Sequence, residues 1–169
     1  TWRDVGQFDK AREAFLLAVR AEDKVGYVPI RDIEQLANVE ARMGERKGQV
    51  ELIDLAVRRL KTLNELVADA TDNKEKAIVA NAERSALLGS AYKRKASLFA
   101  TRILVADADA DAKARAEAGS LMKTALEQSS AAYREAEGVP GSSTFLPYNA
   151  LNRLAIDALL PLRESARAA

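Results

Sequence analysis

The sequence predicts an all-α fold of antiparallel helical hairpins, and three observations support this prediction. Alanine, leucine, arginine, glutamate and lysine dominate the 169 residues, and all five are strong helix formers. Only eight glycines and four prolines interrupt them. Between these breaks apolar residues recur at helical spacing, and no segment shows the alternation of a strand. With 48% hydrophobic and 30% charged residues, the composition is that of a globular chain.

The charge and residue counts argue against several function classes. The 26 basic residues nearly equal the 25 acidic ones, so the chain lacks the basic excess of nucleic-acid-binding proteins. It has no cysteine and no histidine, which removes thiolate nucleophiles, imidazole bases and the usual zinc ligands. No apolar run is long enough to cross a bilayer. We therefore expect a cytoplasmic protein without nucleic-acid, membrane or cofactor partners, and not an enzyme.

Glycine and proline residues divide the chain into six predicted helices, three of them in the first 70 residues. The first extends from about Gln7 to Ala21 and the second from Ile30 to Met43. Gly44 and Gly48 are predicted to bracket a polar turn, after which the third helix extends to about residue 70. The residues predicted to face inward recur every three or four positions: Phe8, Ala11, Phe15, Ala18, Ile33, Leu36, Ala37, Met43, Leu52, Ile53, Ala56, Leu60 and Leu63.

The second half of the chain contains three longer helices. The fourth is predicted over 74–104 with cap residues at 71–73, and the fifth over 113–137. A loop at 138–144 precedes the sixth helix, which begins near Pro147 and is predicted to stop or kink at Pro161. The predicted core face of the sixth helix consists of Leu151, Leu154, Ala155, Ala158 and Leu159.

Two short patterns carry a resemblance to a known repeat. Gly6, Phe8, Ala11, Phe15 and Ala18 have the spacing of the second helix of a tetratricopeptide repeat, in which small alanines permit close helix packing beside the aromatic rings. The segment 88–92, Leu-Gly-Ser-Ala-Tyr, resembles the first helix of such a repeat. The same register fits the Leu-Ala pair at 36–37 and the Leu-Asn pair at 151–152.

The resemblance implies an α-α superhelix in which helices two, four and six are first helices. It divides a single domain, residues 1–169, into repeats at about 1–25, 28–70, 74–138 and 144–169. Trp2 falls where a first helix has its last aromatic residue, so we expect the chain to begin within a repeat of a longer protein. The matching leucines are 52 and 63 residues apart (36 to 88, and 88 to 151), against 34 in the consensus repeat. The repeats are therefore expected to be elongated and irregular.

Such an array implies a protein-interaction module with a concave surface lined by the first helices. The residues expected there are Arg31, Glu34, Asn38, Arg42, Glu83, Ser90, Lys93, Arg94, Asn149, Arg153 and Asp157. Asparagine can hold a peptide backbone as both donor and acceptor, and lysine or arginine can bind a carboxylate. We therefore expect a protein or peptide partner, with an extended acidic peptide or a C-terminal carboxylate as the ligand.

Other interpretations of the same residues stay open. The segments at 34–38, 87–94 and 147–152 resemble helical-repeat regions of large bacterial signalling proteins, some with caspase-like (CHAT) protease domains. A regulatory domain, sensory or inhibitory, of such a protein is the alternative function. The exposed ends of an array could also pair two copies into a homodimer. Residues 93–95 could be a solvated stripe, and Asn38 and Asn149 could serve as caps.

Overall fold

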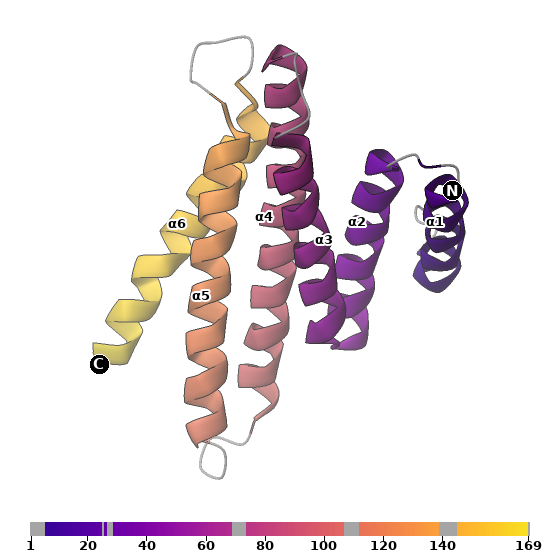
Figure 1. Ribbon diagram of the computed structural model, residues 1–169. Helices are drawn as coiled ribbons and strands as arrows, with labels where there is room; N and C mark the ends of the chain where they lie inside the picture. Colours follow the sequence, from indigo (N-terminus) through magenta and orange to yellow (C-terminus); the bar gives the residue numbers. More distant parts are fainter. Residues whose placement is uncertain are drawn as a thin grey trace. The chain divides into compact units, whose positions relative to one another are not determined.

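The structure, a computed structural model, describes residues 6–24, 26, 29–68, 74–106, 112–138 and 145–168. Within these ranges it contains six α-helices and no strand, which confirms the predicted all-α class (Figure 1). The helices are α1 (Phe8–Asp23), α2 (Ile30–Lys47), α3 (Val50–Ala68), α4 (Lys74–Val105), α5 (Ala112–Ala136) and α6 (Pro147–Ala168). Trp2 and the predicted cap residues 71–73 lie outside the described residues.

Two helix ends differ from the prediction. Gly44 is part of α2, which continues to Lys47, and only Gly48 adopts the left-handed conformation that ends the helix. A Cβ at Gly44 would lie 2.7 Å from both the Gln49 carbonyl oxygen and Ile53 Cγ1, so this glycine allows close packing of α2 on α3. Of the predicted stop or kink at Pro161, the stop is wrong, because α6 continues through this residue to Ala168, and the kink stays a prediction.

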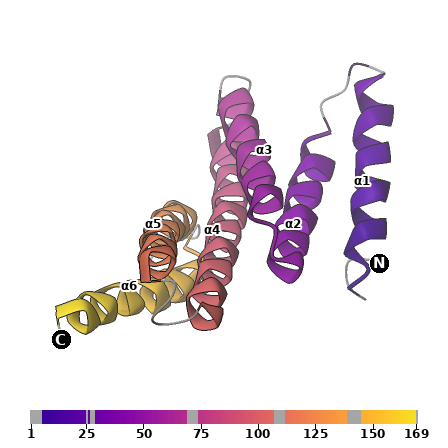
Figure 2. The same cartoon turned by 90° about the horizontal axis from the view of Figure 1, so that it is seen from below.

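The chain divides into two compact units, residues 1–77 and residues 78–169; its assignment to one domain stays a prediction. In the first unit α2 packs against both α1 and α3, which form its two flanks (Figure 2). The core residues of this unit confirm most of the predicted inward faces: Ala11, Leu36, Ala37, Met43, Ile53, Ala56, Leu60 and Leu63 are buried. Phe8 and Phe15, by contrast, are only partly buried.

A buried carboxylate joins the three helices of the first unit. Glu40 of α2 is fully buried, and its Oε1 accepts a hydrogen bond from Arg12 Nε of α1 at 3.1 Å. Its Oε2 accepts from Arg59 Nε of α3 at 2.9 Å. The two guanidinium groups compensate the charge that burial would otherwise penalise.

In the second unit α4, α5 and α6 meet around the ring of Tyr133. Tyr133 is buried with Ala96, Ala125, Leu126 and Ile156. Ser129 Oγ donates to the Gly89 carbonyl oxygen of α4 at 2.7 Å, which fixes the contact between α4 and α5. The buried residues of α4 and α5 include Leu88, Ala91, Tyr92, Phe99, Ala118, Ala125, Ser129, Ala132, Tyr133 and Ala136. Leu121, which helical spacing places on the inward face of α5, is instead 40% exposed.

The predicted core face of α6 is wrong. Leu151, Leu154 and Leu159 are 66%, 53% and 52% exposed, and Ala155 and Ala158 are exposed as well. The buried residues of α6 are instead Asn149 and Ile156. Because α6 has apolar residues on two sides, helical spacing alone does not show which side packs against the rest of the unit.

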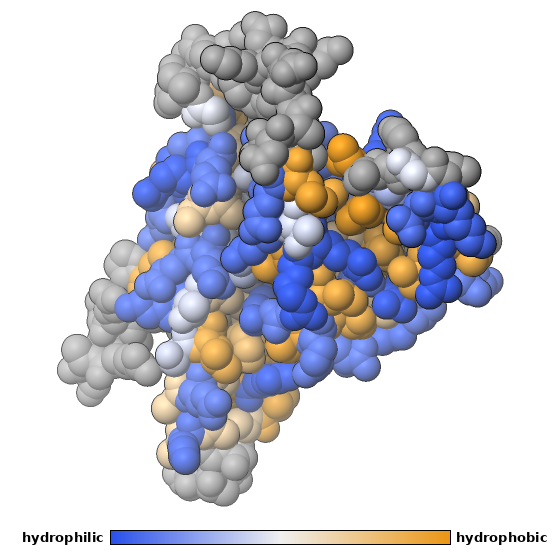
Figure 3. Space-filling view, in the orientation of Figure 1, coloured by the Kyte–Doolittle hydropathy of each residue, from blue (hydrophilic) through white to orange (hydrophobic). Residues whose placement is uncertain are grey.

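The surface carries both hydrophilic and hydrophobic residues. On the face drawn in Figure 3, hydrophilic residues lie between hydrophobic ones along the helices. Among the helices of the described residues, none combines the length and the apolar content needed to cross a membrane.

Candidate functional site

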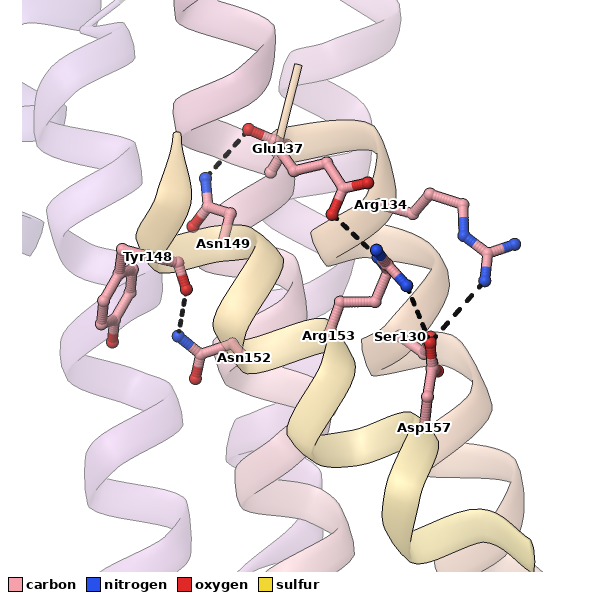
Figure 4. Close-up of polar contacts among 9 residues, drawn as sticks. Ser130, Arg134, Glu137, Tyr148, Asn149, Asn152, Arg153 and Asp157 are labelled. Carbon is pink, nitrogen blue, oxygen red and sulfur yellow. Dashed lines mark hydrogen bonds and ion pairs between the residues drawn. The ribbon is translucent and has the colours of Figure 1, made fainter. Parts of the chain in front are cut away.

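Lys93 and Asn152 bring two predicted first helices together. Lys93 Nζ of α4 donates a hydrogen bond to Asn152 Oδ1 of α6 at 2.7 Å. Asn152 Nδ2 in turn donates to the backbone oxygen of Tyr148, one turn earlier in α6, at 2.8 Å (Figure 4). The amide is thus held by its own helix with its oxygen toward the ammonium group. The sequence analysis predicts Lys93 as a site residue but neither Tyr148 nor Asn152. The signal for these two residues is their four-residue spacing, which places them on one face of a helix.

The phenol of Tyr133 lies beside this contact. Lys93 Nζ is 5.7 Å from the centre of the Tyr133 ring, within the range of a cation–π interaction. Burial and the charge of Tyr148 raise the pKa of Tyr133 to about 12, against the opposing effects of a hydrogen bond with Ser90 and the charge of Arg94. Tyr133 is therefore a neutral hydrogen-bonding group at pH 7. The predicted site residues Ser90, Lys93 and Arg94 surround it.

We call this surface the Lys93 face and define it as Ser90, Lys93 and Arg94 of α4 with Tyr148 and Asn152 of α6. Tyr148 is 70% exposed and Lys93 is half-buried. Among the described residues Lys93 contacts no carboxylate, because its partners are an amide oxygen and an aromatic ring. The face thus retains the positive charge of Lys93 beside several groups that can donate or accept hydrogen bonds.

The other predicted site residues of α6 contact α5 instead (Figure 4). Arg153 donates to Glu137 Oε2 at 2.8 Å through Nε and to Asp157 Oδ2 at 3.0 Å through Nη1. Asp157 also accepts a hydrogen bond from Ser130 and lies 3.9 Å from Arg134 Nη2. The hydrogen bond to Glu137, followed by that to Asp157, raises the pKa of Arg153 despite the opposing effect of desolvation. Two carboxylates therefore already neutralise the guanidinium group of Arg153.

Asn149 has a structural partner, as the capping interpretation predicts. Its side chain is buried, and Nδ2 donates to the Ala136 backbone oxygen at 2.9 Å (Figure 4). Ala136 is the last residue of α5, where carbonyl groups lack partners within the helix. Asn149 therefore connects the start of α6 to the end of α5.

The remaining predicted residues are distributed along α2 and α4. In α2, Arg31 is exposed and Glu34 is buried. Asn38 Oδ1 accepts a hydrogen bond from Arg42 Nε, one turn later in the same helix, at 3.3 Å. In α4, Glu83 is exposed. Their membership of a ligand-binding surface stays a prediction.

The first unit contains a hollow of about 490 Å³ between the start of α1 and the end of α2. Of the three cationic side chains that line it, Arg46 and Lys47 are engaged within the unit, and Lys10 is exposed. Arg46 Nη1 donates to the Gly6 backbone oxygen at 3.0 Å, and Lys47 Nζ lies 2.6 Å from Asp9 Oδ1. Because Arg46 and Lys47 already have partners and Lys10 is an exposed, flexible side chain, the hollow is a weaker candidate for anion binding than the Lys93 face.

Comparison with known families agrees with the helical-repeat architecture. The profile of the family described as Tetratricopeptide Repeats-Sensor matches residues 7–159, which is most of the chain. No curated protein and no solved structure matches the sequence. The match includes α1 to α5 and α6 up to Leu159, and therefore includes the Lys93 face.

Proposed function

We propose, from the premise that the chain belongs to the Tetratricopeptide Repeats-Sensor family, that it is a binding module whose Lys93 face takes an acidic or C-terminal segment of a partner protein. The family match supports a protein-interaction or sensory role. The single observation that carries the finer proposal is the contact of Lys93 with Asn152. There α4 and α6 place the ammonium group of Lys93, which contacts no carboxylate among the described residues, beside the oriented side-chain amide of Asn152.

The chemistry of the face suits a carboxylate on an extended backbone. The ammonium group of Lys93 supplies a charge-assisted hydrogen bond, which contributes about 1.5–3 kcal/mol. Hydroxyl and amide groups of Ser90, Tyr148 and Asn152 can orient the rest of the ligand by hydrogen bonds. Arg153 is an unsuitable carboxylate ligand because Glu137 and Asp157 already hold it.

Peptide binding measured by fluorescence anisotropy tests this proposal. The probes are acidic peptides that end in a free carboxylate, and the same peptides with an amidated terminus. Lys93→Glu and Arg94→Glu are each expected to raise Kd about 10- to 100-fold, which corresponds to the loss of one charge-assisted hydrogen bond. Lys61→Glu, a charge reversal at an exposed position of α3, is the matched control and is expected to leave Kd unchanged.

Two further measurements separate the contribution of α2 from that of the Lys93 face, and that of a terminal carboxylate from that of acidic side chains. Arg42→Glu tests whether α2 takes part in binding, because Arg42 belongs to the predicted surface but not to the Lys93 face. Equal affinity for the free and amidated termini would assign the interaction to acidic side chains. Unchanged affinity in Lys93→Glu and Arg94→Glu would overturn the proposed site, and turnover of generic hydrolase substrates by the purified chain would contradict a purely binding role.

The family description as a sensor favours a second candidate function, that of a regulatory domain in a multidomain bacterial signalling or protease protein. In that case ligand binding would alter the activity of a catalytic domain attached to this module. The test is to compare Lys93→Glu in the isolated chain and in the parent protein. A change in catalytic output that follows the loss of peptide affinity would support regulation.

A further inference from the structure

The Lys93 face continues along α6 as an exposed apolar surface. Tyr148, which belongs to that face, is followed on successive turns by Leu151, Ala155 and Leu159, and all four residues are exposed. Because their spacing is three or four residues, these side chains lie on one side of the helix. We call Leu151, Ala155 and Leu159 the α6 stripe. A contiguous exposed apolar surface of this kind is typical of an interaction site.

Asn152 places the α6 stripe next to the ammonium group of Lys93. It accepts the hydrogen bond from Lys93, and at 3.6 residues per turn Leu159 lies only about 20° around the helix from it. In the other direction α6 begins less than two turns before Asn152, at Pro147. A ligand that binds Lys93 and continues along α6 toward its C-terminal end therefore lies over Ala155 and Leu159.

Positive charge is confined to the Lys93 end of this surface. Arg153 is the only lysine or arginine between residues 148 and 159. Figure 4 shows Arg153 on the side of α6 away from Asn152, where two carboxylates neutralise it. The α6 stripe itself is uncharged, so a carboxylate placed on it would lose hydration without gaining a counter-ion. The surface thus suits one carboxylate next to apolar side chains and disfavours a run of acidic residues.

The spacing of the α6 stripe matches that of an extended peptide. Four residues of an α-helix rise about 6 Å along its axis, and two residues of an extended chain span about 6.6 Å. Alternate side chains of an extended ligand can therefore contact Ala155 and Leu159 in turn, once its terminal carboxylate is bound at Lys93. Because Ala155 is small, the side chain next to that carboxylate has room to be large.

Building on the proposed function, we propose that the ligand is the C-terminal tail of a partner protein with apolar residues at its last and third-from-last positions. The terminal carboxylate binds Lys93, the last side chain lies against Ala155, and the third-from-last side chain lies against Leu159. The α6 stripe thus determines which tail is bound. Charge favours this ligand over a second copy of the chain, because the uncharged stripe of another copy has no carboxylate to offer Lys93.

Fluorescence anisotropy with two labelled peptides tests this specificity. Both peptides end in a free carboxylate, and they differ only in having leucine or serine at the last and third-from-last positions. The leucine peptide is expected to bind about 10- to 100-fold more tightly, because its two leucine side chains are partly buried on the stripe. Equal affinity, or tighter binding of a peptide with aspartate at these two positions, would overturn the proposal.

Two leucines on different sides of α6 provide a matched pair of variants. Leu159→Ser is expected to weaken binding of the leucine peptide about 10-fold and to leave that of the serine peptide unchanged. Leu154 and Leu159 are 53% and 52% exposed, but Leu154 lies about 160° around the helix from Asn152. Leu154→Ser is therefore the control and should alter neither affinity. Ala155→Leu should change the preferred last residue from leucine to alanine, a result that loss of folding cannot produce.

The outcomes separate this proposal from the function on which it rests. If Lys93→Glu weakens the binding of both peptides and Leu159→Ser weakens neither, the Lys93 face stands and the tail specificity is wrong. If Lys93→Glu weakens neither, the proposed function itself fails. Sedimentation velocity examines the remaining occupant. A dimer that Leu159→Ser disrupts would show that a second copy covers the α6 stripe, and would overturn its assignment to a peptide tail.

Discussion

Gly89 of α4 lies directly against the ring of Tyr133 of α5. A Cβ added at Gly89 would lie 2.8 Å from Tyr133 Cδ2 and 2.9 Å from Cε2 and Cγ. Ser129, one turn before Tyr133, donates its hydroxyl hydrogen to the Gly89 carbonyl oxygen. Glycine at this position thus lets a serine and a tyrosine of α5 approach the α4 backbone, which explains the glycine of the Leu-Gly-Ser-Ala-Tyr pattern at 88–92.

Gly89→Ala is expected to destabilise the second unit by about 1–3 kcal/mol, because the added methyl group overlaps a buried ring. Chemical denaturation followed by circular dichroism measures this change in the free energy of unfolding. A double-mutant cycle with Tyr133→Ala is the control, since the cost of Gly89→Ala should decrease once the ring is absent. An equal cost in both backgrounds would show that the ring is not the source of the strain.

Glu40→Ala is expected to lower the free energy of unfolding by about 2–3 kcal/mol. Removing one partner of a buried ion pair costs about 3–5 kcal/mol, but Arg12 and Arg59 are partly exposed, and water can take up part of their charge. Lys47→Ala, which breaks the exposed pair with Asp9, is the comparison and should cost less than about 1 kcal/mol. Thermal denaturation of both variants in one buffer checks the order, and equal costs would contradict it.

Stability is expected to decrease between pH 10 and pH 12 because of Tyr133. The folded protein keeps the phenol proton up to a pKa of about 12, whereas the unfolded chain loses it near 10. The folded state binds more protons in this window, so the free energy of unfolding falls as the pH rises, by roughly 2–3 kcal/mol in total.

The measurement for this prediction is a set of urea denaturation curves across the pH window, with Tyr133→Phe beside the original chain. Deprotonation of lysines affects both proteins, so the difference between their slopes isolates Tyr133. The variant should show the shallower decrease. Parallel slopes would show that the phenol is not protected from ionisation in the folded state.

Asn149→Ala is expected to cost about 1–3 kcal/mol, because it leaves the Ala136 carbonyl oxygen at the end of α5 without its hydrogen-bond donor. Asn149→Asp should cost more than Asn149→Ala. A carboxylate would face both a carbonyl oxygen and the negative end of the α5 dipole. Hydrogen exchange at the α5–α6 connection, followed by mass spectrometry, provides a local readout. An aspartate variant as stable as the original chain would contradict the capping role.

Much of the fold could be predicted because its signals are local. Gly48 ends α2 in a left-handed conformation, and the sequence analysis predicts a turn at this glycine. Gly6 and Gly138, which also lie next to helices, likewise have positive φ. The tetratricopeptide resemblance was confirmed over residues 7–159. The site was anticipated less well. Lys93 was nominated, but its partner Asn152 was not, because a contact between α4 and α6 depends on how the two helices cross.

The amino-acid sequence alone determined that this chain is helical, where its helices begin and end to within a few residues except at the end of α6, and which repeat family it belongs to. These properties depend on backbone propensities and on residues within a few turns of one another. Only the tertiary structure decided which side of α6 is buried and which charges are neutralised. Leu151 and Ile156 are both apolar residues of one helix, yet the first is exposed and the second is buried. The difference depends on the position of α5, and the same packing brings Glu137 to Arg153, whose other partner, Asp157, is one turn away in α6 itself.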